Sequence, residues 1–201
     1  MTREELKSKA KQALKGNWTI TIITMLVANI IIGAEGLILV CDYYDLDQVI
    51  KVATASSMVS FLLSGVIATG YSKFLLDMVA KGQEPKFTTL FSQFNVYFKA
   101  LGLSILISIT IFVGTILFVV PGSMLTLMWS QAYYILAEDP TKSITQCMSE
   151  SAALMDGHKM DLLLLELSFI GWWFVAGITC GIGALWVAPY VAVTKTNFYL
   201  D

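Results

Sequence analysis

The sequence predicts an all-α, polytopic membrane protein whose six transmembrane helices form three hairpins, each preceded by a cytoplasmic interfacial amphipathic helix. Three observations predict this fold: the composition, the long apolar runs and the distribution of basic residues. Apolar residues make up 56% of the 201-residue chain and charged residues only 14%. A soluble domain is typically about half apolar and a quarter charged, so the composition favours a membrane protein.

Six apolar runs are long enough to cross a bilayer, whose core of about 30 Å needs about 20 helical residues. They cover residues 18–40, 52–79, 100–120, 122–137, 162–180 and 183–199. Pro189 interrupts the last run, so we expect it to be kinked, short or partly re-entrant. The runs leave little chain for a soluble part. Residues 1–201 are therefore expected to form one membrane domain, with possible units at 1–80, 86–137 and 139–201.

The basic residues predict the orientation of the chain. Twelve of the thirteen Lys and Arg residues fall on one side of the six-span map, and only Lys51 falls on the other. Because Lys and Arg in short loops mark the cytoplasmic face, both termini are expected in the cytoplasm. Residues 1–16 are polar and charged, unlike a signal peptide, so the first apolar run is expected to remain as a span of a cytoplasmic (plasma) membrane protein.

A segment with helical apolar periodicity precedes each pair of spans. Thr2 and Glu5 have the spacing of a capping box, and Gly16 and Gly157 are suited to helix C-termini. Such segments are expected to lie in the cytoplasmic interface, with the apolar face against lipid or the bundle. The apolar positions are Leu6, Ala10, Ala13 and Leu14; Phe87, Leu90, Phe91, Phe94 and Phe98; and Ile144, Cys147, Met148, Ser151, Ala152 and Met155.

Two acidic residues, Glu35 and Glu166, lie within apolar runs, and Asn29 precedes the first of them. A carboxylate in hydrocarbon is costly, so it usually faces the bundle, is protonated or lines a hydrated path. These three residues form a candidate intramembrane polar site, for a proton or cation relay or for a cationic substrate. The alternative is that Glu35 lies near the outer interface and Glu166 near the inner one, where water reaches each. Their different depths argue against a directly paired dyad.

Lys73 and Asp77 have the i, i+4 spacing of an ion pair and are expected to anchor the cytoplasmic end of the second span. His158 is the only histidine, and the sequence places no nucleophile or orienting partner beside it. We therefore expect His158 to be a solvated loop residue.

The sequence contains no catalytic, nucleotide-binding or cofactor motif, so an enzyme is not expected. Cys41, Cys147 and Cys180 are widely separated, which argues against a metal site or a disulfide framework. A net charge of −2 and the lack of a basic arm argue against nucleic acid as a partner. Membrane lipids and a membrane or cytoplasmic protein are the expected partners, and the oligomeric state stays open.

The second half of the chain carries a specific resemblance, and the first half a looser one. The matching residues are Lys9-Ala10, Ala13-Leu14, Gly16, Tyr134–Pro140, Ser149–Ser151, Leu154–Lys159, Leu167–Trp172, Gly181–Gly183, Leu185-Trp186, Ala188–Tyr190 and Phe198-Tyr199. They resemble the bacterial integral-membrane family called domain-of-unknown-function family nine-seven-five, found largely in Firmicutes. That family is distantly similar to the membrane domains of some glycerophosphodiester phosphodiesterases. The resemblance implies six spans in a Gram-positive plasma membrane, and it implies no activity and no catalytic residues.

The function expected from these observations is that of a non-enzymatic structural, accessory or lipid-organising membrane protein. A small transporter or exporter component for a lipid, peptide or other amphiphile is the alternative, and it requires Glu35 and Glu166 to face one cavity. A lipid-active enzyme is a third class, and it requires polar side chains clustered around His158.

Overall fold

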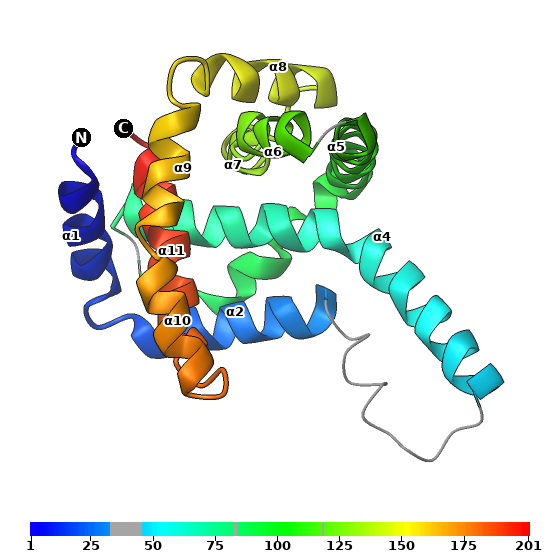
Figure 1. Cartoon of the computed structure of the whole chain (residues 1–201), viewed down its shortest axis with the longest axis horizontal. Coiled ribbons are helices and arrows are strands. Elements are labelled where there is room, and N and C mark those ends of the chain that lie inside the picture. Colours follow the sequence, from blue (N-terminus) through cyan, green and yellow to red (C-terminus); the bar gives the residue numbers. More distant parts are fainter. Residues whose placement is uncertain (33–45, 83, 118) are drawn as a thin grey trace.

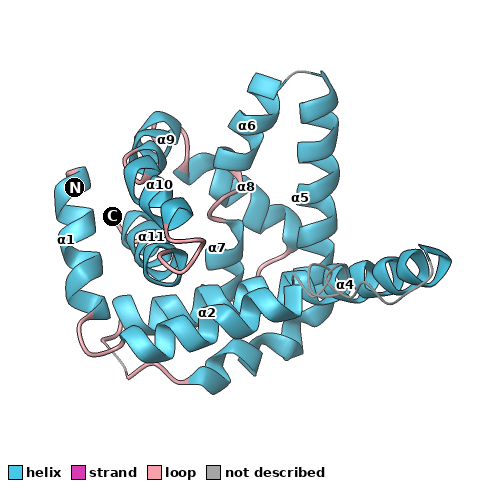
Figure 2. Ribbon diagram, turned by 60° about the horizontal axis from the view of Figure 1, so that its bottom comes forward, coloured by secondary structure: helices cyan, strands magenta, loops and turns pink. Residues whose placement is uncertain are grey.

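The computed structural model describes residues 1–32, 46–82, 84–117 and 119–201, and the elements in these ranges are all helical (Figures 1 and 2). The all-α prediction is therefore confirmed. The elements are α1 (Arg3–Leu14), α2 (Trp18–Ile32), α4 (Leu46–Val79), the 3-10 helix η1 (Phe87–Val96), α5 (Tyr97–Leu117), α6 (Val119–Met128), α7 (Ala132–Glu138), α8 (Ile144–Leu154), α9 (Lys159–Leu167), α10 (Ile170–Ile178) and α11 (Ala184–Tyr199).

Three helical stretches are long and apolar enough to cross a membrane: Ile50–Val79, Phe87–Ile116 and Lys159–Ile178. If the bent pair α1–α2 is counted as one broken span, the number of candidate spans rises to four. Only 22–28% of the residues in these stretches are buried inside the protein, so most of their apolar side chains face outward as in lipid-exposed helices. Six crossings stay a prediction, because α6 has 10 residues and α11 has 16, fewer than a straight crossing requires.

Helix α1 begins with the capping box that its sequence predicts. The Thr2 side chain accepts a hydrogen bond from the Glu5 amide, and the Glu5 carboxylate accepts one from the Thr2 amide. After α1 the chain passes through Gly16, whose φ of 90° is in the left-handed region, and α2 leaves at 98° to α1. The apolar face of α1 packs on protein: Leu6, Ala10 and Leu14 are buried.

The segment before α5 differs from the regular helix with an aromatic stripe that we expected. It is a 3-10 helix, so every third residue faces the same way, and Leu90, Gln93 and Val96 are the buried set. Phe91, Phe94 and Phe98 point outward, and Phe98 is 83% exposed. Phe87 is partly buried and packs against the core.

Helix α8 occupies the third expected segment. A capping box of Ser143 and Gln146 opens it, and Gly157, with a φ of 78°, follows it. Cys147, Ser151 and Met155 are buried, so the apolar face of α8 is covered by the rest of the protein.

Two of the helical stretches contact the stretch that follows them in the chain. Along α9–α10 and α11, the ring centroids of Phe169 and Tyr190 lie 5.3 Å apart in an edge-to-face arrangement. Along α5 and α6–α7, the hydroxyl of Ser104 lies 3.0 Å from that of Tyr133. Figures 1 and 2 show that the α2–α4, α5–α6 and α9–α11 pairs lie crosswise to one another. They therefore differ from a bundle of six helices sharing one direction.

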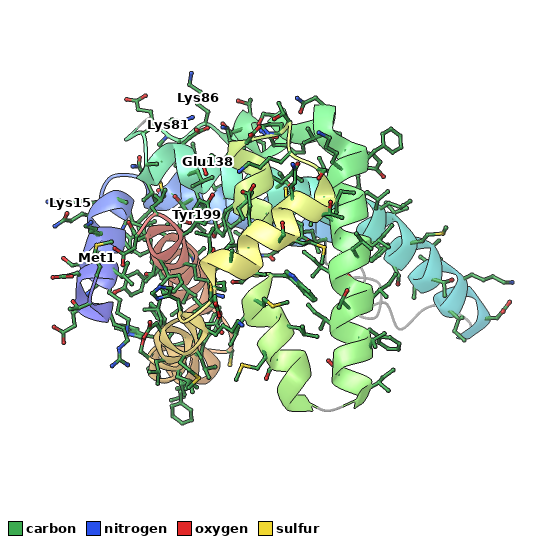
Figure 3. All side chains as sticks on the ribbon, turned by 90° about the horizontal axis from the view of Figure 1, so that it is seen from above. Met1, Lys15, Lys81, Lys86, Glu138 and Tyr199 are labelled. Atoms are coloured by element: carbon green, nitrogen blue, oxygen red, sulfur yellow. The ribbon has the colours of Figure 1, made fainter. Side chains whose placement is uncertain are left out.

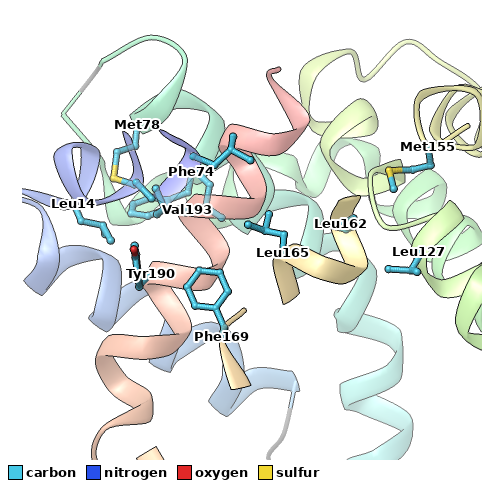
Figure 4. Close-up of a cluster of buried hydrophobic side chains, with 13 residues drawn as sticks. Leu14, Phe74, Met78, Leu127, Met155, Leu162, Leu165, Phe169, Tyr190 and Val193 are labelled. Carbon is cyan, nitrogen blue, oxygen red and sulfur yellow. The ribbon is translucent and has the colours of Figure 1, made fainter. Parts of the chain in front are cut away.

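The largest buried cluster lies where α1, α4, α9 and α11 meet (Figure 4). Phe74 of α4 and Phe169, just before α10, are each 1% exposed and fill its centre with Leu162 and Leu165 of α9. These contacts fix α9 against α11, and that junction positions the candidate site.

Candidate functional site

Glu166 lies on α9, one residue after the fully buried Leu165. Burial of Leu162 and Leu165 turns the Glu166 side chain toward α11, where its Oε1 lies 2.6 Å from the Nζ of Lys195. Both side chains are 37% exposed. Glu166 is the only charged residue between Leu162 and Ile178, so this partly exposed charge pair is the most polar feature of that part of the candidate span.

Lys195 lies in the polar C-terminal half of α11. Its neighbours Thr194, Thr196 and Asn197 are buried and donate hydrogen bonds to carbonyl oxygens one turn earlier in the same helix, at 2.7, 3.0 and 3.1 Å. Because both threonine hydroxyls donate to the backbone of their own helix, they add no free donor to the site. Among these four residues, only Lys195 directs a charge toward α9.

The ion pair lies in a groove of about 510 Å³ between α5, α6–α7, α9 and α11, which we call the ion-pair groove. Its polar lining comes from Ser123, Thr126, Ser130 and Tyr133, with Glu166 and Lys195. Thr126 donates to the Gly122 carbonyl at 3.0 Å and Ser130 to the Leu127 carbonyl at 2.8 Å. Their hydroxyl oxygens keep lone pairs that can accept hydrogen bonds from a ligand.

The remaining lining is apolar and comes mainly from Ile107, Ile111, Leu127, Trp129 and Leu163. Most ligand sites combine such an apolar wall with a few polar groups. Here the polar groups are one carboxylate, one ammonium and several hydroxyls. This combination can hold a polar group that carries both charges or several hydroxyls.

The other predicted polar residues lie elsewhere. Asn29 is exposed on α2, and Glu35 lies outside the described residues. Asn29 does not line the ion-pair groove, and the site of Glu35, Glu166 and Asn29, with a cavity shared by the two acids, stays a prediction.

Asp77 binds two lysines near the C-terminal end of α4. The predicted partner Lys73 has its Nζ 3.9 Å from Oδ1 of Asp77, whereas Lys81 is closer, at 2.7 Å. This hydrogen bond raises the pKa of Lys81 above its usual value. Figure 3 shows Lys81 and Lys86 near the same outer edge of the molecule. The arrangement is an exposed basic cluster rather than an isolated helix pair.

His158 is 65% exposed, and its Nδ1 lies 3.4 Å from Oδ2 of Asp161. It also lines a separate depression with Tyr199, whose hydroxyl donates to Glu138 at 2.6 Å. The sequence prediction of a solvated residue at this position is confirmed. The enzymatic alternative stays untested by this geometry.

Lys195 was missed as the partner of Glu166, although the sequence contained a signal for it. A tight turn at residues 179–183 reverses the chain, so residues at matched positions before and after it come close in an antiparallel pair. Ala176 lies against Gly183 and Phe169 lies against Tyr190, and this register places residue 193 opposite Glu166. Lys195 lies two residues beyond that position, so counting outward from the turn would have brought the two charges near each other.

Comparison with known proteins adds a family but no activity. The chain matches the family described as "Protein of unknown function (DUF975)" over residues 1–127 and 115–201. No curated protein and no solved structure matches it. The similarity to membrane domains of glycerophosphodiester phosphodiesterases therefore stays a prediction.

Proposed function

We propose that this chain, which belongs to the DUF975 family of unknown function, is a non-enzymatic, lipid-binding accessory protein of the bacterial plasma membrane. Its candidate spans are long, apolar and mostly uncovered by protein, which supports a position in lipid. The distribution of basic residues supports cytoplasmic termini.

The proposed topology has six crossings arranged as three antiparallel pairs, with η1 and α8 at the cytoplasmic interface and α1 packed along α11. The contacts within the α5–α6 and α9–α11 pairs support antiparallel neighbours. Helices that cross one bilayer tilt by at most about 40° from its normal. The topology therefore requires the pairs to align more closely in a membrane than they do in Figures 1 and 2.

The observation that carries the lipid-binding proposal is the ion pair of Glu166 and Lys195 in its groove. A partly exposed ion pair contributes little to folding stability, because water or lipid head groups compete for both charges. This pair is open on a groove whose lining combines apolar side chains with hydroxyls. Such a site holds a polar head group while the acyl chains remain in the surrounding lipid.

The test is lipid retention by protein purified in mild detergent, measured by native mass spectrometry. Glu166→Gln and Lys195→Gln are expected to lower the retained lipid severalfold, because each removes one of the two charges facing the groove. Asp161→Asn is the matched control: Asp161 lies on the same helix, is 64% exposed and does not line the groove. Equal retention in all three variants would contradict the proposal.

One further observation favours an amphiphile transporter as a second function. Ser123, Thr126 and Ser130 are spaced along one face of the α6 region and extend the polar lining away from the ion pair. A row of hydroxyls of this kind suits a head group that moves along the groove. For this function, Glu166→Gln and Glu35→Gln are expected to abolish export of an amphiphile from cells without lowering the amount of folded protein. Unchanged export in both variants would exclude the relay role of these acids.

A further inference from the structure

A second groove, of about 330 Å³, lies on the other side of α11 where the α10–α11 turn meets the α1–α2 bend. We call it the tryptophan groove. Its main lining residues are Lys11, Trp18, Trp172, Trp186, Val187 and Tyr190. Lys11 is the only charged residue in the lining, and no residue is shared with the ion-pair groove.

The groove exists because small residues bring α10 and α11 together at its base. A Cβ on Gly183 would lie 3.0 Å from the Cα of Ala176, so the two backbones are in close contact there. Trp172 and Trp186 stand on either side and are 50% and 51% exposed. The hollow between these large rings is left unfilled by any side chain of the described residues.

The bend of 98° between α1 and α2 places a basic helix end beside this hollow. The Nζ of Lys11 lies 5.8 Å from the centre of the Tyr190 ring, and the Nζ of Lys7 lies 4.3 Å from that of Phe169. Lys7 also donates to the Ser168 carbonyl at 3.3 Å, which fixes α1 against the start of α10. Lys11 has no ion-pair partner among the described residues.

Charge and composition together select the occupant. The described segment 1–15 has five basic and two acidic residues, so the mouth of the groove is positive. Tryptophans prefer the head-group level of a bilayer, and an apolar hollow at that level suits an acyl chain. A lysine near the surface of an anionic leaflet adds attraction of about 1 kcal/mol, and a zwitterionic lipid supplies no net charge for it.

We infer that the tryptophan groove binds an acyl chain of an anionic phospholipid, whose phosphate pairs with the Lys11 ammonium. The inference rests on the proposed lipid-binding function and adds the lipid class and a second position. Binding there would hold α1 against the α10–α11 turn, since the head group contacts α1 and the chain contacts α10 and α11.

Tryptophan fluorescence tests the inference directly, because a bromine atom on a lipid chain quenches an indole that it touches. Detergent-solubilised protein is titrated with phosphatidylglycerol, and separately with phosphatidylcholine, both carrying brominated acyl chains. Half-maximal quenching is expected at a concentration about fivefold lower for phosphatidylglycerol, the factor that one lysine contributes. Lys11→Glu is expected to abolish this preference.

Lys9→Glu is the matched control, because Lys9 is exposed on the same helix, makes the same charge change and does not line the groove. It is expected to keep the preference. Trp186→Phe is expected to lower the amplitude of quenching while the half-maximal concentration stays unchanged, since it removes one reporting indole and little volume.

Equal quenching by the two lipids would overturn the inference. Equal loss of preference in Lys9→Glu and Lys11→Glu would also overturn it, in favour of general charge attraction. Lipid retention that depends on Glu166 and Lys195, found together with equal quenching, would leave the proposed function standing. If lipid retention does not depend on Glu166 and Lys195 and the quenching is also equal, the proposed function is overturned as well.

Discussion

Gly70 of α4 packs directly on the backbone of Leu90 in η1. A Cβ on Gly70 would lie 1.9 Å from the Leu90 carbonyl oxygen and 2.8 Å from its carbonyl carbon. Real Cβ atoms do not approach other atoms so closely. Leu90 is itself fully buried, so η1 cannot simply move away. The contact fixes the crossing of the long helix α4 with the segment that leads into α5.

Gly70→Ala is therefore expected to destabilise the protein by about 1–3 kcal/mol, the usual cost of forcing a methyl group into packed structure. The measurement is thermal unfolding of the purified protein in detergent. Gly171→Ala is the control, because no atom lies within 4 Å of a Cβ at that position in α10. It is expected to be neutral or to stabilise by up to about 1 kcal/mol through helix propensity. Equal melting of the two variants would contradict the close contact.

The elements that the sequence predicted best are those determined by local chemistry. The capping box of Thr2 with Glu5 acts over three residues, so its spacing was recognised directly. The box of Ser143 with Gln146 has the same spacing, but it was not predicted. Gly157 likewise takes the left-handed conformation that a helix end favours. The apolar length of α4, η1–α5 and α9–α10 depends only on composition, and it was also predictable.

The features that escaped prediction depend on contacts between distant segments. The burial of Leu90 rather than Phe91 in η1 follows from the approach of Gly70, which periodicity alone does not show. The Glu166–Lys195 pair depends on the register of two helices. Each charge was recognised in the sequence, but it was considered alone.

Exchanging the two charges tests whether the Glu166–Lys195 contact is a true pair. Glu166→Lys and Lys195→Glu are each expected to lower stability, because each places two like charges beside each other. The double variant is expected to recover most of the loss, with a coupling of about 0.5–1 kcal/mol for a half-exposed pair. The stability of the wild type, the two single variants and the double variant is measured by thermal unfolding in detergent at low salt.

The same cycle at high salt provides the control. Salt screens an exposed pair strongly and a covered one weakly, so the coupling is expected to fall as salt rises. Additive effects of the two substitutions at low salt would show that the two side chains do not interact. If the double variant regains stability but not lipid retention, lipid binding depends on which position carries which charge, and not only on the pairing.

The capping box of α8 predicts a second stability effect. The Ser143 hydroxyl accepts from the Gln146 amide at 3.3 Å, and the Gln146 side chain accepts from the Ser143 amide at 2.8 Å. Ser143→Ala leaves the Gln146 amide unpaired at the helix start and is expected to cost about 1 kcal/mol. Ser143→Asp keeps an acceptor at this position and is expected to restore stability. Unfolding that is identical in wild type and Ser143→Ala would show that α8 does not depend on this cap.

The proposed topology predicts opposite accessibility for two positions that flank α9–α10. Cys180 is exposed in the turn before α11, on the expected outer side, and Cys147 is fully buried in α8, on the expected inner side. Burial also raises the pKa of the Cys147 thiol, which lowers its thiolate fraction and slows its reaction with maleimides. In a Cys41→Ser background, a membrane-impermeant maleimide is expected to label Cys180 in intact protoplasts.

Ser149→Cys, introduced without the native cysteines, supplies an exposed thiol on α8 as the inside control. It is expected to react only after the membrane is permeabilised. Labelling of Ser149→Cys but not of Cys180 in intact protoplasts would mean that the orientation is inverted. Labelling of both from the same side would mean that α9–α10 does not cross the bilayer, and it would reduce the number of crossings below six. Because the helix between these positions carries Glu166, this result also determines whether the ion-pair groove lies within the membrane.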